Sequence, residues 1–187
     1  MTPSREEALA LLHAHTTNPS LIKHALAVEA VMRALARDYG GDPELWGITG
    51  LLHDFDYERH PTREGHPYEG RRILEAQGYP DTVIRAIMGH ADYTGVPRDT
   101  DLARALFSAD ELSGFVMAVA LVRGRSLAGL SAPVVRKKLR DKAFARSVSR
   151  EDVMRGAEEL GVDLDAHIER VVAAMATIAP QLELTGP

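Results

Sequence analysis

The sequence predicts an all-α protein. Start and stop signals typical of helices recur along the whole chain, and apolar residues follow a helical period. No segment alternates as a half-buried strand would, since Val134-Val135 and Val171-Val172 both lie within helical patterns. Because the 187 residues contain no repeat, low-complexity tract or linker, we expect one helical domain over residues 1–187.

The first three helices have well-marked ends. Ser4 and Glu7 match a capping box, which predicts a helix that begins just after Ser4. Asn18-Pro19 predicts the start of the second helix, because asparagine is a good N-cap and proline fits the first helical position; Gly40-Gly41 ends it. Asp42-Pro43 starts a third helix that is predicted to reach about His53.

The remaining elements follow from the same signals. A loop over residues 54–66 is predicted, because it contains Pro61 and Gly65. The other predicted elements are a helix from Pro67 to about Gly78, a helix from Asp81 to about His90, a loop over 91–99, a long helix over 100–122, an irregular segment over 123–132, and helices from Pro133, from Ser149 and over 163–179.

Composition limits the chemistry. Hydrophobic residues make up 45% of the chain and aromatic residues 5%, so the core is expected to be aliphatic. Cysteine is absent, so any metal ion must be bound by nitrogen and oxygen. No apolar run approaches the length of a transmembrane helix and the N-terminus does not resemble a signal peptide, so we expect a cytoplasmic protein without membrane contact.

Positive charge is concentrated in one segment. Residues 123–150 contain nine basic residues and one acid, Asp141, for a net charge of +8, so the rest of the chain carries -13. This asymmetry favours a small anionic ligand over nucleic acid, because interleaved aromatic residues are scarce. The predicted substrate-binding residues of this segment are Arg123, Arg125, Lys137, Lys138 and Lys142. The alternative is that the segment is only a solvated helix face.

Several polar residues occupy inward or near-inward helical positions. His24 lies on the apolar stripe of the second helix, and His53-Asp54 follows the third. Asp110 lies within an apolar face, where burying a carboxylate without a partner is costly. A cation is the natural partner; the alternatives are a core histidine at His24 and a pairing of Asp110 with Arg104.

Taken in order, these residues resemble the HD-domain metal-dependent phosphohydrolase superfamily. His66-Pro67-Tyr68-Glu69-Gly70 and Ile87-Met88-Gly89-His90 are similar to the additional histidine motifs of its dinuclear branch. The resemblance implies a single-domain HD-type helical bundle, with a metal-binding core over about 20–120 and a helical extension over about 123–187. It also implies a first metal held by His24, His53, Asp54 and Asp110, and a second held by His66 and His90, with Asp54 bridging.

The segment after His53-Asp54 departs from the better-known members. Several dinuclear members carry a lysine where this chain has Tyr57, and mononuclear nucleotidases often place a glutamate acid there. Asp56 and Glu58 flank this position, so the general acid stays open. The predicted catalytic residues are Asp54, Asp56 and His66.

The predicted function is hydrolysis of a small, nucleotide-like phosphate ester by metal-activated water. Histidine and aspartate ligands favour one or two ions of Mn, Fe, Co, Ni or Zn over Mg. The alternatives are a di-iron oxygenase on the same scaffold and a non-catalytic helical module that contains a metal. The sequence does not specify the substrate or the oligomeric state.

Overall fold

The computed structural model describes residues 3–186 and confirms the all-α prediction. Within those residues there is no strand, and a single antiparallel bridge joins Ser126 to Thr185. The helices are α1 (Arg5–His15), α2 (Pro19–Tyr39), α3 (Pro43–Leu52), α4 (Tyr68–Ala76), α5 (Asp81–Gly89), the 3-10 helix η1 (Asp92–Thr94), α6 (Asp101–Val122), α7 (Ala132–Arg140), α8 (Arg150–Leu160), α9 (Leu164–Ala176) and α10 (Ala179–Leu182).

The predicted capping signals operate as expected. Ser4 and Glu7 form a reciprocal capping box at α1. The side chains of Asn18 and Asp42 each accept a hydrogen bond from the backbone two residues later, with proline as the first residue of the helix. Gly40 ends α2 in the left-handed conformation, at φ 68°, which glycine adopts without a steric penalty. Local sequence therefore determines where these helices begin and end.

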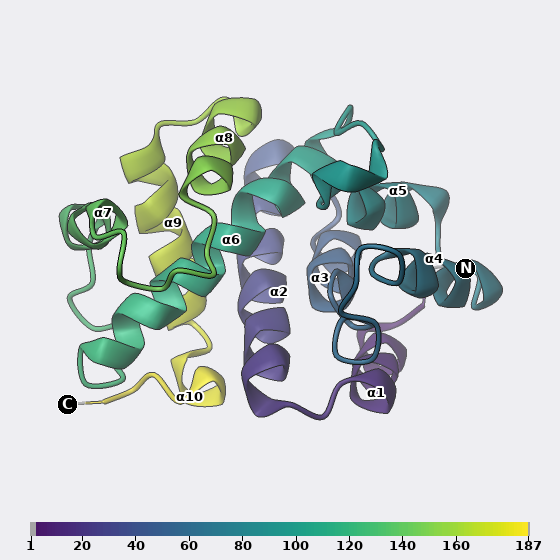
Figure 1. Ribbon diagram of the computed structural model, residues 1–187, viewed down its shortest axis with the longest axis horizontal. Coiled ribbons are helices and arrows are strands. Elements are labelled where there is room, and N and C mark those ends of the chain that lie inside the picture. The colour runs from purple at the N-terminus through teal and green to yellow at the C-terminus, as the bar shows by residue number, and fades with distance from the viewer. Residues whose placement is uncertain (1–2, 187) are drawn as a thin grey trace.

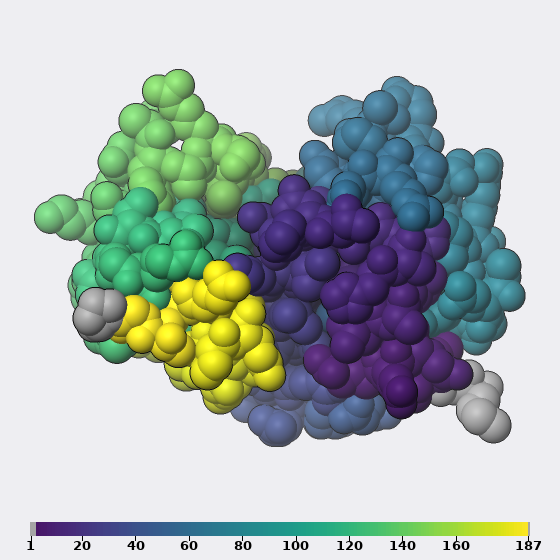
Figure 2. Space-filling view, turned by 90° about the horizontal axis from the view of Figure 1, so that it is seen from below, coloured from purple at the N-terminus to yellow at the C-terminus, as the bar shows by residue number. Residues whose placement is uncertain are grey.

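Helices α2 and α6 pack against each other at the centre of the molecule. Helices α1, α3, α4 and α5 lie on one side of this pair, and α7, α8, α9 and α10 lie on the other (Figure 1). The C-terminal segment returns to α2, where Lys23 pairs with Glu183 at 2.7 Å; Figure 2 shows this segment in yellow beside the N-terminal helices. The two longest helices thus connect the two halves of the bundle.

Helix α6 corrects one expectation from the sequence. Its 22 residues include a stretch that is long and apolar enough to cross a membrane, with a mean hydropathy of 1.6. More than half of that stretch is buried inside the protein, including Leu106, Leu112 and Phe115. Core helices have the same composition, because a helix surrounded by other helices is apolar on most of its surface.

Candidate metal centre

The His53-Asp54 pair lies where α3 ends against α2. His53 is fully buried and directly follows the last residue of α3. A Cβ atom on Gly50 would lie 2.9 Å from both the Val28 carbonyl oxygen and the Met32 Cγ atom. Only glycine therefore permits this close approach of α3 to α2, which brings His53 within reach of His24.

The first group of candidate ligands joins α2, α6 and the end of α3. His24 Nε2 lies 3.0 Å from Asp110 Oδ1 and 3.2 Å from His53 Nε2. His53 Nε2 lies 3.3 Å from Asp110 Oδ1 and 3.5 Å from Asp54 Oδ2. The structure thus brings together all four residues that the resemblance assigns to a first metal.

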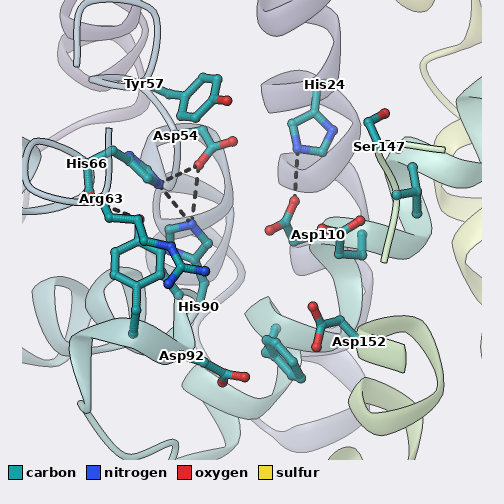
Figure 3. Close-up of a pocket in the computed structure, with 16 residues that line it drawn as sticks. His24, Asp54, Tyr57, Arg63, His66, His90, Asp92, Asp110, Ser147 and Asp152 are labelled. Atoms are coloured by element: carbon teal, nitrogen blue, oxygen red, sulfur yellow. Dashed lines mark hydrogen bonds and ion pairs between the residues drawn. The ribbon is translucent and has the colours of Figure 1, made fainter. Parts of the chain in front are cut away.

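The second group lies on the other side of Asp54. Asp54 Oδ1 is 3.2 Å from His66 Nε2 and 3.3 Å from His90 Nε2, and these two nitrogens are 3.3 Å apart. In Figure 3, His66 and His90 lie on one side of Asp54, and His24 and Asp110 lie on the other. Asp54 thus presents one oxygen to each group, as a carboxylate that bridges two ions would.

Three histidine rings are oriented through their second nitrogen. His53 Nδ1 lies 2.8 Å from the Gly50 carbonyl oxygen, and His90 Nδ1 bonds the Ile87 carbonyl oxygen. His66 Nδ1 lies 2.8 Å from Asp56 Oδ1. A carbonyl oxygen only accepts, so Nδ1 carries a proton in His53 and His90, and in the neutral ring Nε2 is left with a lone pair. Nε2 lone pairs directed at two aspartates form a donor set that fits a divalent transition metal.

The electrostatics of the two groups are unusual for buried histidines. Burial opposes protonation of His66, yet hydrogen bonds to Asp54 and Asp56 raise its pKa to about 9. Burial likewise opposes the raised pKa values of His53 and His90, which arise from the carboxylates of Asp54 and Asp110. The pKa values of these two carboxyls are lowered, because the histidines outweigh the effect of burial. The cluster thus favours positive charge, from protons or from a metal.

Asp110 does not pair with an arginine, which was the alternative to a metal site. Arg104 instead binds Asp101 at 2.9 Å. A different buried carboxylate, Glu29, shows the usual solution, since it accepts hydrogen bonds from Arg5 and Arg33. Within residues 3–186, no arginine or lysine lies within ion-pair distance of Asp110, so histidine is its only partner type there.

The predicted catalytic residue Asp56 lies beside His66 and away from the cavity. Its side chain is buried and does not line the cavity beside the cluster. One oxygen accepts from His66, and the other accepts from the Gly70 backbone N–H at 2.8 Å. Each oxygen therefore already has a hydrogen-bond partner, and one of the two orients His66. Glu58, the other flanking acid, binds the backbone N–H groups of Thr17 and Asn18 instead.

A cavity of about 760 Å³ opens beside the cluster. Figure 2 shows its surroundings as a hollow between two projections, one near residue 60 and one near residue 145. Tyr57 lies in its wall, with its ring edge-on to His66 at 5.4 Å. The lining residues are His24, Asp54, Tyr57, Arg63, His66, His90, Ala91, Asp92, Tyr93, Phe107, Asp110, Glu111, Gly114, Ser147, Val148 and Asp152.

Sequence analysis missed four charged residues of this wall, which are Arg63, Asp92, Glu111 and Asp152. Arg63 lies in the loop before His66, and nothing in its local pattern distinguishes it from a surface arginine. Glu111 follows Asp110 directly, and burial together with the Asp110 charge raises its pKa to about 7. Its position beside an inward-facing aspartate was the one available signal.

The predicted substrate-binding residues lie elsewhere. None of Arg123, Arg125, Lys137, Lys138 and Lys142 lines the cavity of the cluster. Arg125 pairs with Glu183 at 2.9 Å, whereas Arg123, Lys137 and Lys138 line a separate pocket on α7 and the end of α6. The chain turns after α6, so the five predicted side chains do not reach the cavity, although Ser147 and Val148 near the other end of the +8 segment line it.

Comparison with known families agrees with this geometry. The model of the HD domain matches residues 21–114, half of the chain, and this region contains all six candidate ligands. The chain belongs to the HD-domain family. Neither the curated proteins nor the solved structures include a match to it. HD domains are generally metal-dependent hydrolases, so membership of the family supports reading the His/Asp cluster as a metal site. The part of the cavity wall formed by Ser147, Val148 and Asp152 lies outside the matched region.

Proposed function

We propose that this HD-domain protein is a metal-dependent hydrolase of small phosphate esters. The observation that carries the proposal is the arrangement around Asp54. Its two oxygens face separate groups of imidazole nitrogens, and both groups border one cavity. Two divalent ions about 3.5–4 Å apart, held in this way, are typical of enzymes that transfer or hydrolyse phosphoryl groups.

The residues of the cluster have two proposed roles, which are to bind the ions and to orient the ligands. His24, His53 and Asp110 would hold one ion, and His66 and His90 the other, with Asp54 shared. Bound ions supply Lewis acidity and hydroxide near neutral pH. Asp56 keeps His66 aimed at its site through its hydrogen bond to Nδ1, as outer-shell carboxylates of metal centres do. Nitrogen and oxygen donors favour Mn, Fe, Co, Ni or Zn over Mg.

The first test is metal content. Protein purified without an affinity tag should contain at least about one transition metal ion per chain, and Asp54→Ala should lose it because both groups use this carboxylate. Asp99→Ala is the matched control, since Asp99 is an exposed carboxylate that pairs with Arg85 away from the cluster. A folded wild-type protein that takes up no metal would contradict the proposal.

The second test is activity. Phosphate release from a panel of nucleotides and sugar phosphates, with Mn, Co or Mg, should occur in the wild type and in Asp99→Ala but not in Asp54→Ala. Activity retained by Asp54→Ala would place the chemistry outside this cluster. Oxygen uptake by the iron-loaded protein without phosphate release would favour the di-iron oxygenase instead.

A further inference from the structure

Arg63 is a positive side chain at the cavity beside the second group. It lies on the loop that leads to His66 and lines the cavity. Its guanidinium carbon is 5.1 Å from the centre of the Tyr93 ring, which holds it by a cation–π contact. Within residues 3–186, no carboxylate lies within ion-pair distance of this guanidinium, so its charge is available to a ligand.

Tyr93 links Arg63 to the candidate metal ligands. The Tyr93 hydroxyl donates a hydrogen bond of 2.7 Å to the His66 backbone carbonyl oxygen. The ring that supports Arg63 is therefore attached to the residue that faces the second group. An anion that reaches this group would meet Arg63 as well, and arginine binds phosphoryl oxygens through two parallel N–H groups.

The opposite wall is acidic. Figure 3 shows Arg63 on the side of His66, and Ser147 and Asp152 on the far side, beyond Asp110. Glu111 accepts a hydrogen bond of 3.1 Å from the Ser149 backbone N–H, and no lysine or arginine among the described residues pairs with it. The wall thus contains a carboxylate that no cation neutralises.

The neighbouring charges do not cancel this excess. Asp92 and Asp152 both pair with Arg155, and Arg98 is shared between Asp92 and Glu159. With Glu111, four carboxylates face these two guanidinium groups and that of Arg150, which donates only to backbone carbonyl oxygens. The wall therefore keeps negative charge across the cavity from Arg63, and an anionic group placed there would be repelled.

We propose that Arg63 binds the phosphoryl group of the substrate and that the carboxylates of Glu111 and Asp152 select the other end. The substrate is then a phosphate monoester whose alcohol part carries an ammonium group, and one with a second anionic group is disfavoured. The inference rests on the proposed function, because it assumes that the phosphoryl group is directed to the metal cluster.

Three esters of nearly equal size test this selection. O-phosphoethanolamine, ethyl phosphate and phosphoglycolate carry a positive, a neutral and a negative group at the same end. Binding to the manganese-loaded protein is measured by calorimetry at pH 8. We expect affinity to fall in that order, by roughly tenfold at each step, since an effective dielectric constant of about 20 leaves a substantial interaction across a cavity.

Two pairs of variants assign the effect to residues. Glu111→Gln with Asp152→Asn should reduce the spread among the three esters to less than about tenfold, whereas Glu158→Gln, an exposed carboxylate on the same helix as Asp152, should keep it. Arg63→Gln should weaken all three esters by roughly tenfold or more without changing their order. Its control is Arg72→Gln, an exposed arginine on α4.

The outcomes separate this inference from the proposed function. Equal affinity for the three esters, a reversed order, or no binding of any ester overturns the inference, and so does a spread that Glu158→Gln reduces as much as the double variant. Ordered binding without phosphate release supports the inference and contradicts the proposed function. Phosphate release from esters that bind with equal affinity supports the proposed function and contradicts the inference.

Discussion

Two regions of this protein bury histidine, with opposite results. His53, His66 and His90 lie among carboxylates, and their pKa values are raised although burial acts to lower them. His167 in α9 is just as buried, but its pKa is lowered, because burial outweighs the hydrogen bond to its neutral partner, the Ser108 carbonyl oxygen at 3.1 Å. Burial alone therefore does not distinguish a structural histidine from a candidate ligand; the charge of its neighbours does.

The largest expected difference between the two regions is in stabilisation by metal. A divalent ion at about 100 times its dissociation constant should raise the free energy of unfolding by about 2.7 kcal/mol, because it binds only the folded cluster. Thermal unfolding with and without manganese measures this. His167→Gln should show the full increase and Asp54→Ala none; an equal increase in both variants would place the ion outside the cluster.

A pair of glycines separates packing from ligand placement. Gly50→Ala and Gly156→Ala each force a Cβ atom against backbone, at 2.9 Å from the Val28 carbonyl oxygen and 2.7 Å from the Ser108 Cα atom. Each should cost about 2 kcal/mol in urea unfolding through overpacking. Only Gly50→Ala should also weaken manganese binding, because α3 carries His53. Equal loss of metal affinity in both variants would contradict this view of the cluster.

A smaller effect is expected from the buried partner of His66. Asp56→Asn keeps an oxygen for the Gly70 N–H but weakens the restraint on His66, so manganese affinity should fall by roughly tenfold. Titration with manganese, followed by calorimetry, measures this. If Asp56 acted in proton transfer instead, activity at saturating metal would fall much more than metal affinity.

The smallest effect concerns His167 and pH. Its pKa is lower in the folded protein than in the unfolded chain, so the unfolded chain binds protons more readily below about pH 6.5. The contribution of neutral His167 to the free energy of unfolding is complete above this pH and should be lost as the pH falls further. Urea unfolding of the wild type and His167→Gln should show a smaller loss in the variant; parallel pH curves would mean that His167 does not contribute.

The inward direction of three candidate ligands could be predicted from helical period and helix ends, whereas the full set of six was implied by the family resemblance. His24 and Asp110 lie on inward faces, and His53 follows a helix whose start and end are marked in the sequence. The roles of loop residues were harder to predict. Asp56 and Arg63 belong to one loop, yet tertiary contacts bury the first and leave the second at the cavity.

The basic segment shows the limit of arguments from clustering. Its charges are close in sequence, but the turn at Gly124 and Arg125, both with positive φ, redirects the chain after α6. Lys137 and Lys138 then lie on α7, which packs against α9. A charge count along the chain contains no information about such a reversal of direction. The arginine that lines the cavity is Arg63, which lies far from this segment in sequence.

The cavity wall has a consequence for how this protein can diversify. The candidate ligands all lie within residues 21–114, whereas Ser147, Val148 and Asp152 come from the chain that follows. All the candidate ligands are therefore encoded in the matched stretch, whereas one part of the cavity wall is encoded in a later stretch of sequence. Mutations in the later stretch can change which molecules are accepted while the reactive centre is inherited intact, so close relatives that share every ligand need not share a substrate.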